Sequence, residues 1–118
     1  MIDLLNPNQI FVFGSNLAGI HAGGAARQAY DKFNAAWGIG EGLVGQSYAF
    51  PTLDENFNKL SDERLQQAAS KLIQTAKSIP DKEFLLTKVG CGIAGYPEEK
   101  MKNLFVDVPD NVKKPEGW

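Results

Sequence analysis

Two apolar runs, each followed at once by glycine-rich sequence, dominate the hydrophobic pattern of the chain. The first run covers residues 10–13 and leads into GSNLAGIHAGGAA, and the second covers residues 84–89 and leads into GCGIAGYP. Apolar runs without alternation are typical of strands that are covered on both faces. We therefore predict two buried strands, each of which breaks into a glycine loop and the start of a helix.

Helical spacing of apolar residues separates these strands. Residues 24–36 predict a helix that the glycines of residues 38–42 end, and its buried stripe would be Ala25, Ala26, Ala29, Tyr30, Phe33 and Trp37. A second helix begins after Ser61, which suits the N-cap, and ends at Pro80. Its apolar stripe is Leu65, Ala68, Ala69, Leu72, Ile73 and Ala76. A short third helix is predicted over residues 97–103, with Pro97 in its first turn.

Shorter apolar segments predict the remaining strands. Residues 45–52 have a strand pattern that Pro51 ends, residues 104–108 predict a last strand, and residues 2–5 predict an edge strand or a packing segment. Because strands alternate with helices, we expect an α/β fold with a mainly parallel sheet and right-handed crossovers. The length of 118 residues predicts a single domain, of which residues 109–118 form a tail.

Charge and composition narrow the classes of function. The chain has 12 Lys and Arg against 14 Asp and Glu, so no basic face for duplex nucleic acid is expected. Cys91 and His21 are the single residues of their types, which excludes an internal disulfide and argues against a metal site. The N-terminal sequence has no basic leader and no long apolar run, so we expect no signal peptide, no membrane span and a cytoplasmic setting.

The two glycine loops form the candidate ligand site. Backbone N–H groups at a helix N-terminus attract anions, phosphate above all, and glycine lets the backbone approach a ligand closely. Loops at the same ends of neighbouring parallel strands would form one crevice, where open α/β sheets bind ligands. We therefore expect the strands over residues 10–13 and 84–89 to be adjacent and parallel, with both loops at their carboxyl ends.

The residues of these segments resemble the macrodomain family. FGSNLAGIHAGGAARQAY resembles the macrodomain strand that ends in an asparagine-bearing glycine loop, GLVGQSYAFPT resembles the segment that follows, and LLTKVGCGIAGYP resembles the second phosphate-cradling loop. The chain is most similar, over residues 10–105, to short macro-like proteins of phages and bacteria. The resemblance implies a three-layer α/β/α fold that binds ADP-ribose or a related NAD-derived nucleotide with no separate cofactor. It also implies a possible hydrolase, because some macrodomains cleave ADP-ribosyl linkages.

The resemblance implies roles for individual residues as well. Asn16 would lie near the distal ribose and Tyr96 against the ligand, while the diphosphate would be lined by Gly23, Gly24, Gly92, Ile93, Ala94 and Gly95. Larger macrodomains have an acidic residue before the first loop that recognises adenine. Asp3 is the acidic residue at that end of this chain, and it is a poor match for that role.

Other candidate binding residues come from the chemistry of their side chains. Asn16 could hold ribose hydroxyls or, alternatively, bond its own loop. Gln46 and Ser47 precede the strand of residues 45–52 and could reach a ribose or a base edge, or satisfy loop backbone groups. Gly19 and Gly90, one from each glycine loop, complete the predicted binding set.

Catalysis would depend on Glu41 and His21. A carboxylate in a loop can activate water against a glycosidic carbon, and an imidazole can act as general acid or base. His21 is also a candidate binding residue, because its imidazole could hold a phosphate. The alternatives are a solvated loop charge for Glu41 and an exposed or capping histidine for His21. Three functions stay open: a module that binds an ADP-ribose-like nucleotide, a hydrolase that uses the same pocket, and a non-enzymatic protein-interaction domain.

Overall fold

Strands and helices alternate along the chain in the computed structural model, which describes residues 4–118. The elements are β1 (Gln9–Asn16), α1 (Gly24–Lys32), β2 (Gly42–Val44), β3 (Ser47–Leu53), α2 (Asp62–Ser78), β4 (Glu83–Leu86), α3 (Glu98–Asn103) and β5 (Val112–Lys113). Asp3, together with the start of the predicted segment 2–5, lies outside the described residues, and Leu4 and Leu5 belong to no helix or strand.

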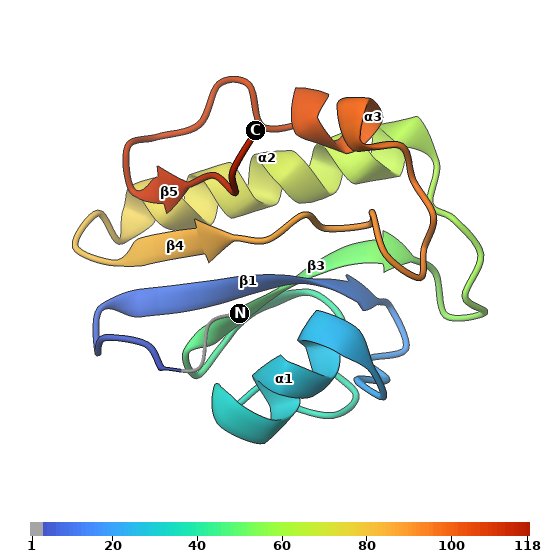
Figure 1. Cartoon of the computed structure of the whole chain (residues 1–118), viewed down its shortest axis with the longest axis horizontal. Coiled ribbons are helices and arrows are strands. Elements are labelled where there is room, and N and C mark those ends of the chain that lie inside the picture. The colour runs from blue at the N-terminus through green and yellow to red at the C-terminus, as the bar shows by residue number, and fades with distance from the viewer. Residues whose placement is uncertain (1–3) are drawn as a thin grey trace.

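The strands form one mixed sheet with the order β2-β3-β1-β4-β5. β1 is parallel to both β3 and β4, β4 is parallel to β5, and β2 is antiparallel to β3. Helix α1 lies on one side of the sheet, and α2 and α3 lie on the other (Figure 1). The α/β class is therefore confirmed, and so is the prediction that the first strand and the strand before the second glycine loop are parallel neighbours.

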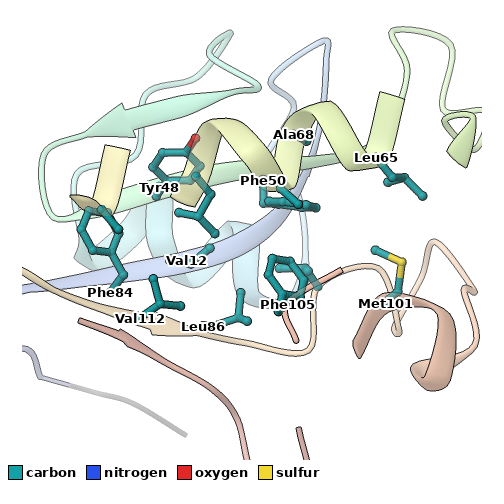
Figure 2. Packing of buried hydrophobic residues seen from close by; sticks show 14 of the residues in the cluster. Val12, Tyr48, Phe50, Leu65, Ala68, Phe84, Leu86, Met101, Phe105 and Val112 are labelled. Carbon is teal, nitrogen blue, oxygen red and sulfur yellow. The ribbon is translucent and has the colours of Figure 1, made fainter. Parts of the chain in front are cut away.

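Side chains of β1 enter two cores. Ile10 and Val12 belong to the larger core with the apolar stripe of α2, whereas Phe11 and Phe13 belong to a smaller core with Ala29 of α1. Figure 2 shows the larger core, in which side chains from the sheet, α2 and the region of α3 meet. Burial on both faces explains why the run of residues 10–13 has no alternation of apolar and polar positions.

Helix α2 confirms the prediction from local signals. The Ser61 side chain accepts a hydrogen bond from the backbone N of Arg64 at 3.2 Å, and Asp62 and Glu63 occupy the first turn, where the helix dipole favours acids. The buried residues of the stripe are Leu65, Ala68, Ala69, Leu72 and Ala76. In the range 4–118, no helix combines the length and the apolar character needed to cross a bilayer.

The strands differ from the predictions in their bounds. β1 continues through Gly14 to Asn16, and β3 continues through Pro51 to Leu53. Pro51 lies opposite Ser15, next to the irregularity in the β1–β3 register, where a missing N–H is tolerated. The predicted strand over residues 104–108 is wrong: this segment forms turns, and its place at the sheet edge is taken by β5.

Helix α1 is shorter than predicted. It ends at Lys32 rather than near residue 36, because Asn34 adopts a left-handed backbone conformation with φ 65°. Ala29 and Phe33 are buried as expected, but Tyr30 and Trp37 are 42% and 51% exposed. They contact each other on the surface, with ring centroids 5.4 Å apart, so the predicted stripe is wrong at these two positions.

Candidate functional site

A cavity of about 590 Å³ lies at the carboxyl ends of β1 and β4. The arrows of β1, β3 and β4 in Figure 1 point toward this side of the molecule. Residues from the end of β1, from the loop before α1, from β3 and the loop after it, and from the loop after β4 line the cavity. The two glycine loops therefore form one crevice, as the sequence predicts.

Close packing of the two loops depends on glycine at two positions. A Cβ atom on Gly14 would lie 3.2 Å from the backbone N of Gly90, which means that β1 and the second loop touch. Gly90 has φ +78°, and a Cβ there would meet Met101 and Tyr96 at 3.0 Å. A side chain at either position would push the second loop away from β1, so these glycines serve the packing of the cavity wall.

The N-terminus of α1 opens into the cavity without a side-chain cap. Gly23 is the N-cap in an extended conformation and has no side chain to cap the helix, and the first turn carries no acidic residue. Ala25 and Ala26, in that turn, line the cavity together with Gly23 and Gly24. A Cβ on Gly23 or Gly24 would have no atom within 4 Å. These N–H groups form a site with the polarity that favours an anion.

The second glycine loop supplies the opposite wall. It is held by its own hydrogen bonds, from Gly95 N to Gly92 O at 3.0 Å and from Tyr96 N to Gly90 O at 2.8 Å. Gly92, Ile93 and Ala94 line the cavity, Ile93 is 92% exposed, and a Cβ on Gly92 would meet nothing within 4 Å. Gly95 lies outside the lining, and its carbonyl accepts a hydrogen bond from Lys59 at 3.3 Å.

Lys88 is the one ionisable side chain among the described residues that line the cavity. Its ammonium lies 3.2 Å from a carboxylate oxygen of Glu98. Hydrogen bonds from Trp118 and Lys88 hold the pKa of Glu98 below its usual value. Both side chains of this pair are about half exposed, so Lys88 can exchange this partner for another anion at small cost.

Asn16 lines the cavity, but its side chain already bonds the loop that follows. Its Nδ2 donates to Ile20 O at 2.9 Å, and its Oδ1 accepts from Ile20 N at 3.0 Å. These two bonds close the turn over residues 16–20 and leave one N–H and one lone pair of the amide for another partner. Asn16 therefore shapes its own loop, whether or not its amide also contacts a ribose.

Gly19 and His21 support this loop from behind, outside the cavity lining. A Cβ on Gly19 would lie 2.2 Å from the carbonyl carbon of Gly38, and Gly38 N donates to Gly19 O at 2.8 Å. His21 is fully buried, its Nε2 lies 2.9 Å from Ala36 O, and its ring meets Phe13 edge to face. Because a carbonyl only accepts, Nε2 carries the proton. The structure thus places His21 in the packing between two loops and outside the cavity lining, away from the ligand contact that the sequence predicts.

Glu41 is held by helix α2 rather than by the cavity. Its carboxylate accepts two hydrogen bonds from the Arg64 guanidinium, at 2.6 and 3.4 Å, and Lys71 lies 4.0 Å away. The side chain is 17% exposed and does not line the cavity. This ion pair fixes the segment before β2 to α2, so Glu41 has a structural partner in place of the predicted water.

Gln46 and Ser47 lie at the opposite end of the sheet. Ser47 begins β3 and pairs with Phe11, whereas the cavity lies beyond the other end of these strands. The Gln46 amide donates to the carbonyls of Asn6 and Gln9 at 3.0 and 3.3 Å, and the Ser47 hydroxyl donates to Val44 O at 2.8 Å. The structure separates both residues from the candidate site, because their side chains bond backbone carbonyls at the end of the sheet where β1 and β3 begin.

Tyr96 anchors the second loop to the core. Its side chain is buried, and its hydroxyl donates to Thr52 O at 2.8 Å and lies 3.3 Å from Leu60 O. It does not line the cavity. In the same loop, burial raises the pKa of the Cys91 thiol and Glu98 adds to the shift, so the thiolate fraction of Cys91 is lowered.

The cavity also includes residues that the sequence interpretation missed. Ile20, Leu53, Phe57, Thr87 and Lys88 line it, and Ile20, like Phe57, is an apolar side chain exposed at its edge. The loop after β3 reads as an ordinary polar turn, and nothing local indicates that it folds against the first glycine loop. Lys88 had a usable signal, since a cation two residues before the first glycine of the second loop suits an anion site. No family model, no curated protein and no solved structure matches this chain.

Proposed function

We propose that this protein is a macrodomain-like module that binds ADP-ribose or a related NAD-derived nucleotide. The observation that carries the proposal is the joint cavity, in which an uncapped helix N-terminus faces a second, internally hydrogen-bonded glycine loop. Two such backbone surfaces on one crevice suit the two phosphates of a dinucleotide-like ligand.

The size and charge of the cavity support an anionic ligand of this class. A volume of about 590 Å³ lies within the range of small-molecule sites. Lys88 contributes a positive charge, and in the described part of the chain no carboxylate lines the cavity. An incoming diphosphate would therefore meet N–H dipoles and one cation, and it would compete with Glu98 for that cation.

Binding is favoured over hydrolysis of an ADP-ribosyl linkage. The two candidate proton-transfer groups, Glu41 and His21, are engaged by Arg64 and Ala36 and do not line the cavity. A general base has to come within hydrogen-bond reach of the attacking water. The arrangement of the cavity therefore supports retention of the nucleotide rather than its turnover.

The first experiment blocks the anion site. We expect Gly92→Val and Gly24→Val to abolish ADP-ribose binding in calorimetry, because each adds a side chain on a wall that is open to the cavity. Gly24 has φ +59°, so its substitution also strains the backbone, whereas Gly92 has no such strain.

Gly38→Val is the matched control for Gly24→Val. Gly38 also has a positive φ, +91°, and open space at its Cβ, but it does not line the cavity. We expect it to lose stability to a similar degree and to keep wild-type affinity. Normal binding by Gly92→Val would refute the diphosphate assignment at that loop, and a thermal-shift panel of ADP-ribose, cyclic ADP-ribose, NAD, AMP and ADP would rank the ligands of the wild type.

A further inference from the structure

The loop between β3 and α2 places an exposed aromatic ring on the cavity. Phe57 lines the cavity, yet its side chain is 51% exposed. Two further exposed apolar side chains, Ile20 and Ile93, line the same cavity from the two glycine loops. Three of the exposed large apolar residues of the described chain thus lie together on one concave surface. Single exposed apolar residues are common, but a group of them is typical of a binding site.

Phe57 is held in this place against its own backbone preference. It has φ 64°, in the left-handed region that bulky residues rarely adopt, although its neighbours Asn56 and Asn58 are of the type that tolerates it. A strained conformation persists only where surrounding bonds impose it, and such positions are concentrated at ligand sites.

Hydrogen bonds around Asp54 impose the conformation. The Asp54 carboxylate accepts from the backbone N of Asn56 and Asn58 at 2.8 and 3.0 Å, and Phe57 N donates to Asp54 O at 3.1 Å. Asp54 N donates to Asn58 O at 2.8 Å, and Leu53 pairs with Lys59 as an isolated bridge. The ring of Phe57 is therefore presented by a closed turn rather than by a loose loop, which lowers the entropy lost when a ligand contacts it.

The turn lies on the β3 side of the cavity, beside the first glycine loop. Leu53 pairs with Asn16, its carbonyl accepts from Leu17 N at 2.9 Å, and Asn16 in turn holds Ile20. Ile20 and Phe57 thus belong to two connected loops, while the N–H groups of α1 and the second loop form other walls. The cavity combines a surface that suits phosphate with an apolar surface that suits a flat ring.

We propose that Phe57 is a binding platform for the planar nitrogen-containing ring of the nucleotide. The inference rests on the proposed function and adds to it the residue that recognises the ring. Two rings share this chemistry, the adenine base and the nicotinamide of NAD-derived ligands. Stacking of a ring on an aromatic side chain tolerates either of them, because both have an apolar face.

Three mononucleotide-sized probes separate the possibilities. AMP carries adenine, nicotinamide mononucleotide carries nicotinamide, and ribose 5-phosphate carries neither. We expect Phe57→Ala to weaken binding of at least one ring-bearing probe by about tenfold or more and to leave ribose 5-phosphate unchanged. The probe that loses affinity identifies the ring, and upfield shifts of its ring protons in NMR spectra with the wild type, absent with Phe57→Ala, would report the stacking directly.

Two variants serve as controls. Phe57→Tyr keeps the ring and should restore the affinity. Tyr30→Ala removes another half-exposed aromatic residue that lies outside the cavity lining, and it should leave all three affinities unchanged.

Equal affinity of the wild type and Phe57→Ala for both ring-bearing probes would overturn the inference while the proposed function stands. An equal loss for ribose 5-phosphate would also overturn it, because Phe57 would then act by shaping its loop. Failure of the wild type to bind ADP-ribose, AMP or nicotinamide mononucleotide would instead refute the proposed function itself, and the inference with it.

Discussion

Tyr96 is a residue whose sequence context and structural role differ. Its Gly-Tyr-Pro context suggests a side chain against the ligand, but the phenol points into the core and bonds the carbonyls of Thr52 and Leu60. Both carbonyls lie more than 30 residues away in the chain, and no local sequence signal shows that the Tyr96 hydroxyl reaches them. Of the predicted glycines, Gly23, Gly24, Gly90 and Gly92 line the cavity, whereas Gly19 and Gly95 do not. The partners of His21 and Glu41 are likewise distant in the chain, and no local signal indicates them.

We expect Tyr96→Phe to lower the free energy of unfolding by about 1 kcal/mol, the typical worth of a lost hydrogen bond. ADP-ribose affinity should stay at the wild-type value, because Tyr96 is not among the residues that line the cavity. Urea unfolding and calorimetry on the same preparation measure the two quantities. A loss of affinity without a loss of stability would place the phenol on the ligand instead.

At the scale of elements, the sequence predicts a helix or strand well when residues within that element define it, and poorly when pairing with a distant segment defines it. Helix α2 is fixed by its own cap and stripe, so the sequence predicts both its place and its buried face. β2 has only three residues and pairs with β3, and β5 has only two and pairs with β4. These short strands depend on their pairing partners, which no local sequence pattern reveals. The segment 104–108 has a strand-like composition, but Phe105 is buried while Val106 is 67% exposed within a series of turns.

The ion pair between Glu41 and Arg64 joins the segment before β2 to α2, and its worth can be measured. We expect a double-mutant cycle with Glu41→Gln and Arg64→Met to give a coupling energy of about 1 kcal/mol, reduced in high salt. The Glu41 side chain is 17% exposed and the Arg64 side chain is 29% exposed, so solvent screens part of their attraction.

The same Glu41→Gln protein tests the hydrolase alternative. It should bind ADP-ribose as the wild type does, because the carboxylate lies outside the cavity lining. If the wild type cleaved an ADP-ribosyl substrate and this variant did not at equal occupancy, Glu41 would return as a general base, since positioned proton transfer contributes about 10²–10⁴-fold.

For the molecule as a whole, we expect buried tyrosine side chains to lower the folding stability at alkaline pH. Burial raises the pKa of Tyr48 from 10.0 to about 12, and burial raises the pKa of Tyr96 in the same direction. A folded-state pKa above the unfolded value means that stability is fully present below pH 10.0 and is lost as the pH rises toward about 12.

We therefore expect the midpoint of urea unfolding to fall between pH 10 and about 12, and expect Tyr48→Phe to flatten this fall. Ultraviolet titration of tyrosinate follows the same event: the two buried phenols of the wild type should ionise late, and the contribution of Tyr48 should be absent from Tyr48→Phe. If the urea midpoint of Tyr48→Phe fell as steeply with pH as that of the wild type, groups other than Tyr48 would be responsible for the loss of stability.

The central position of β1 has a consequence for synthesis of the chain. Gln9 pairs with Glu83, 74 residues later, so β1 cannot complete its hydrogen bonds until β4 has been made. At about 5–20 residues per second, translation leaves this strand waiting roughly 4–15 s. During that time β1 can pair with β3 alone, and the edge that β4 later covers stays open along the apolar segment of residues 10–13, the kind of sequence that associates with other chains. The strand that organises the folded sheet is thus the one that nascent-chain chaperones have most reason to cover.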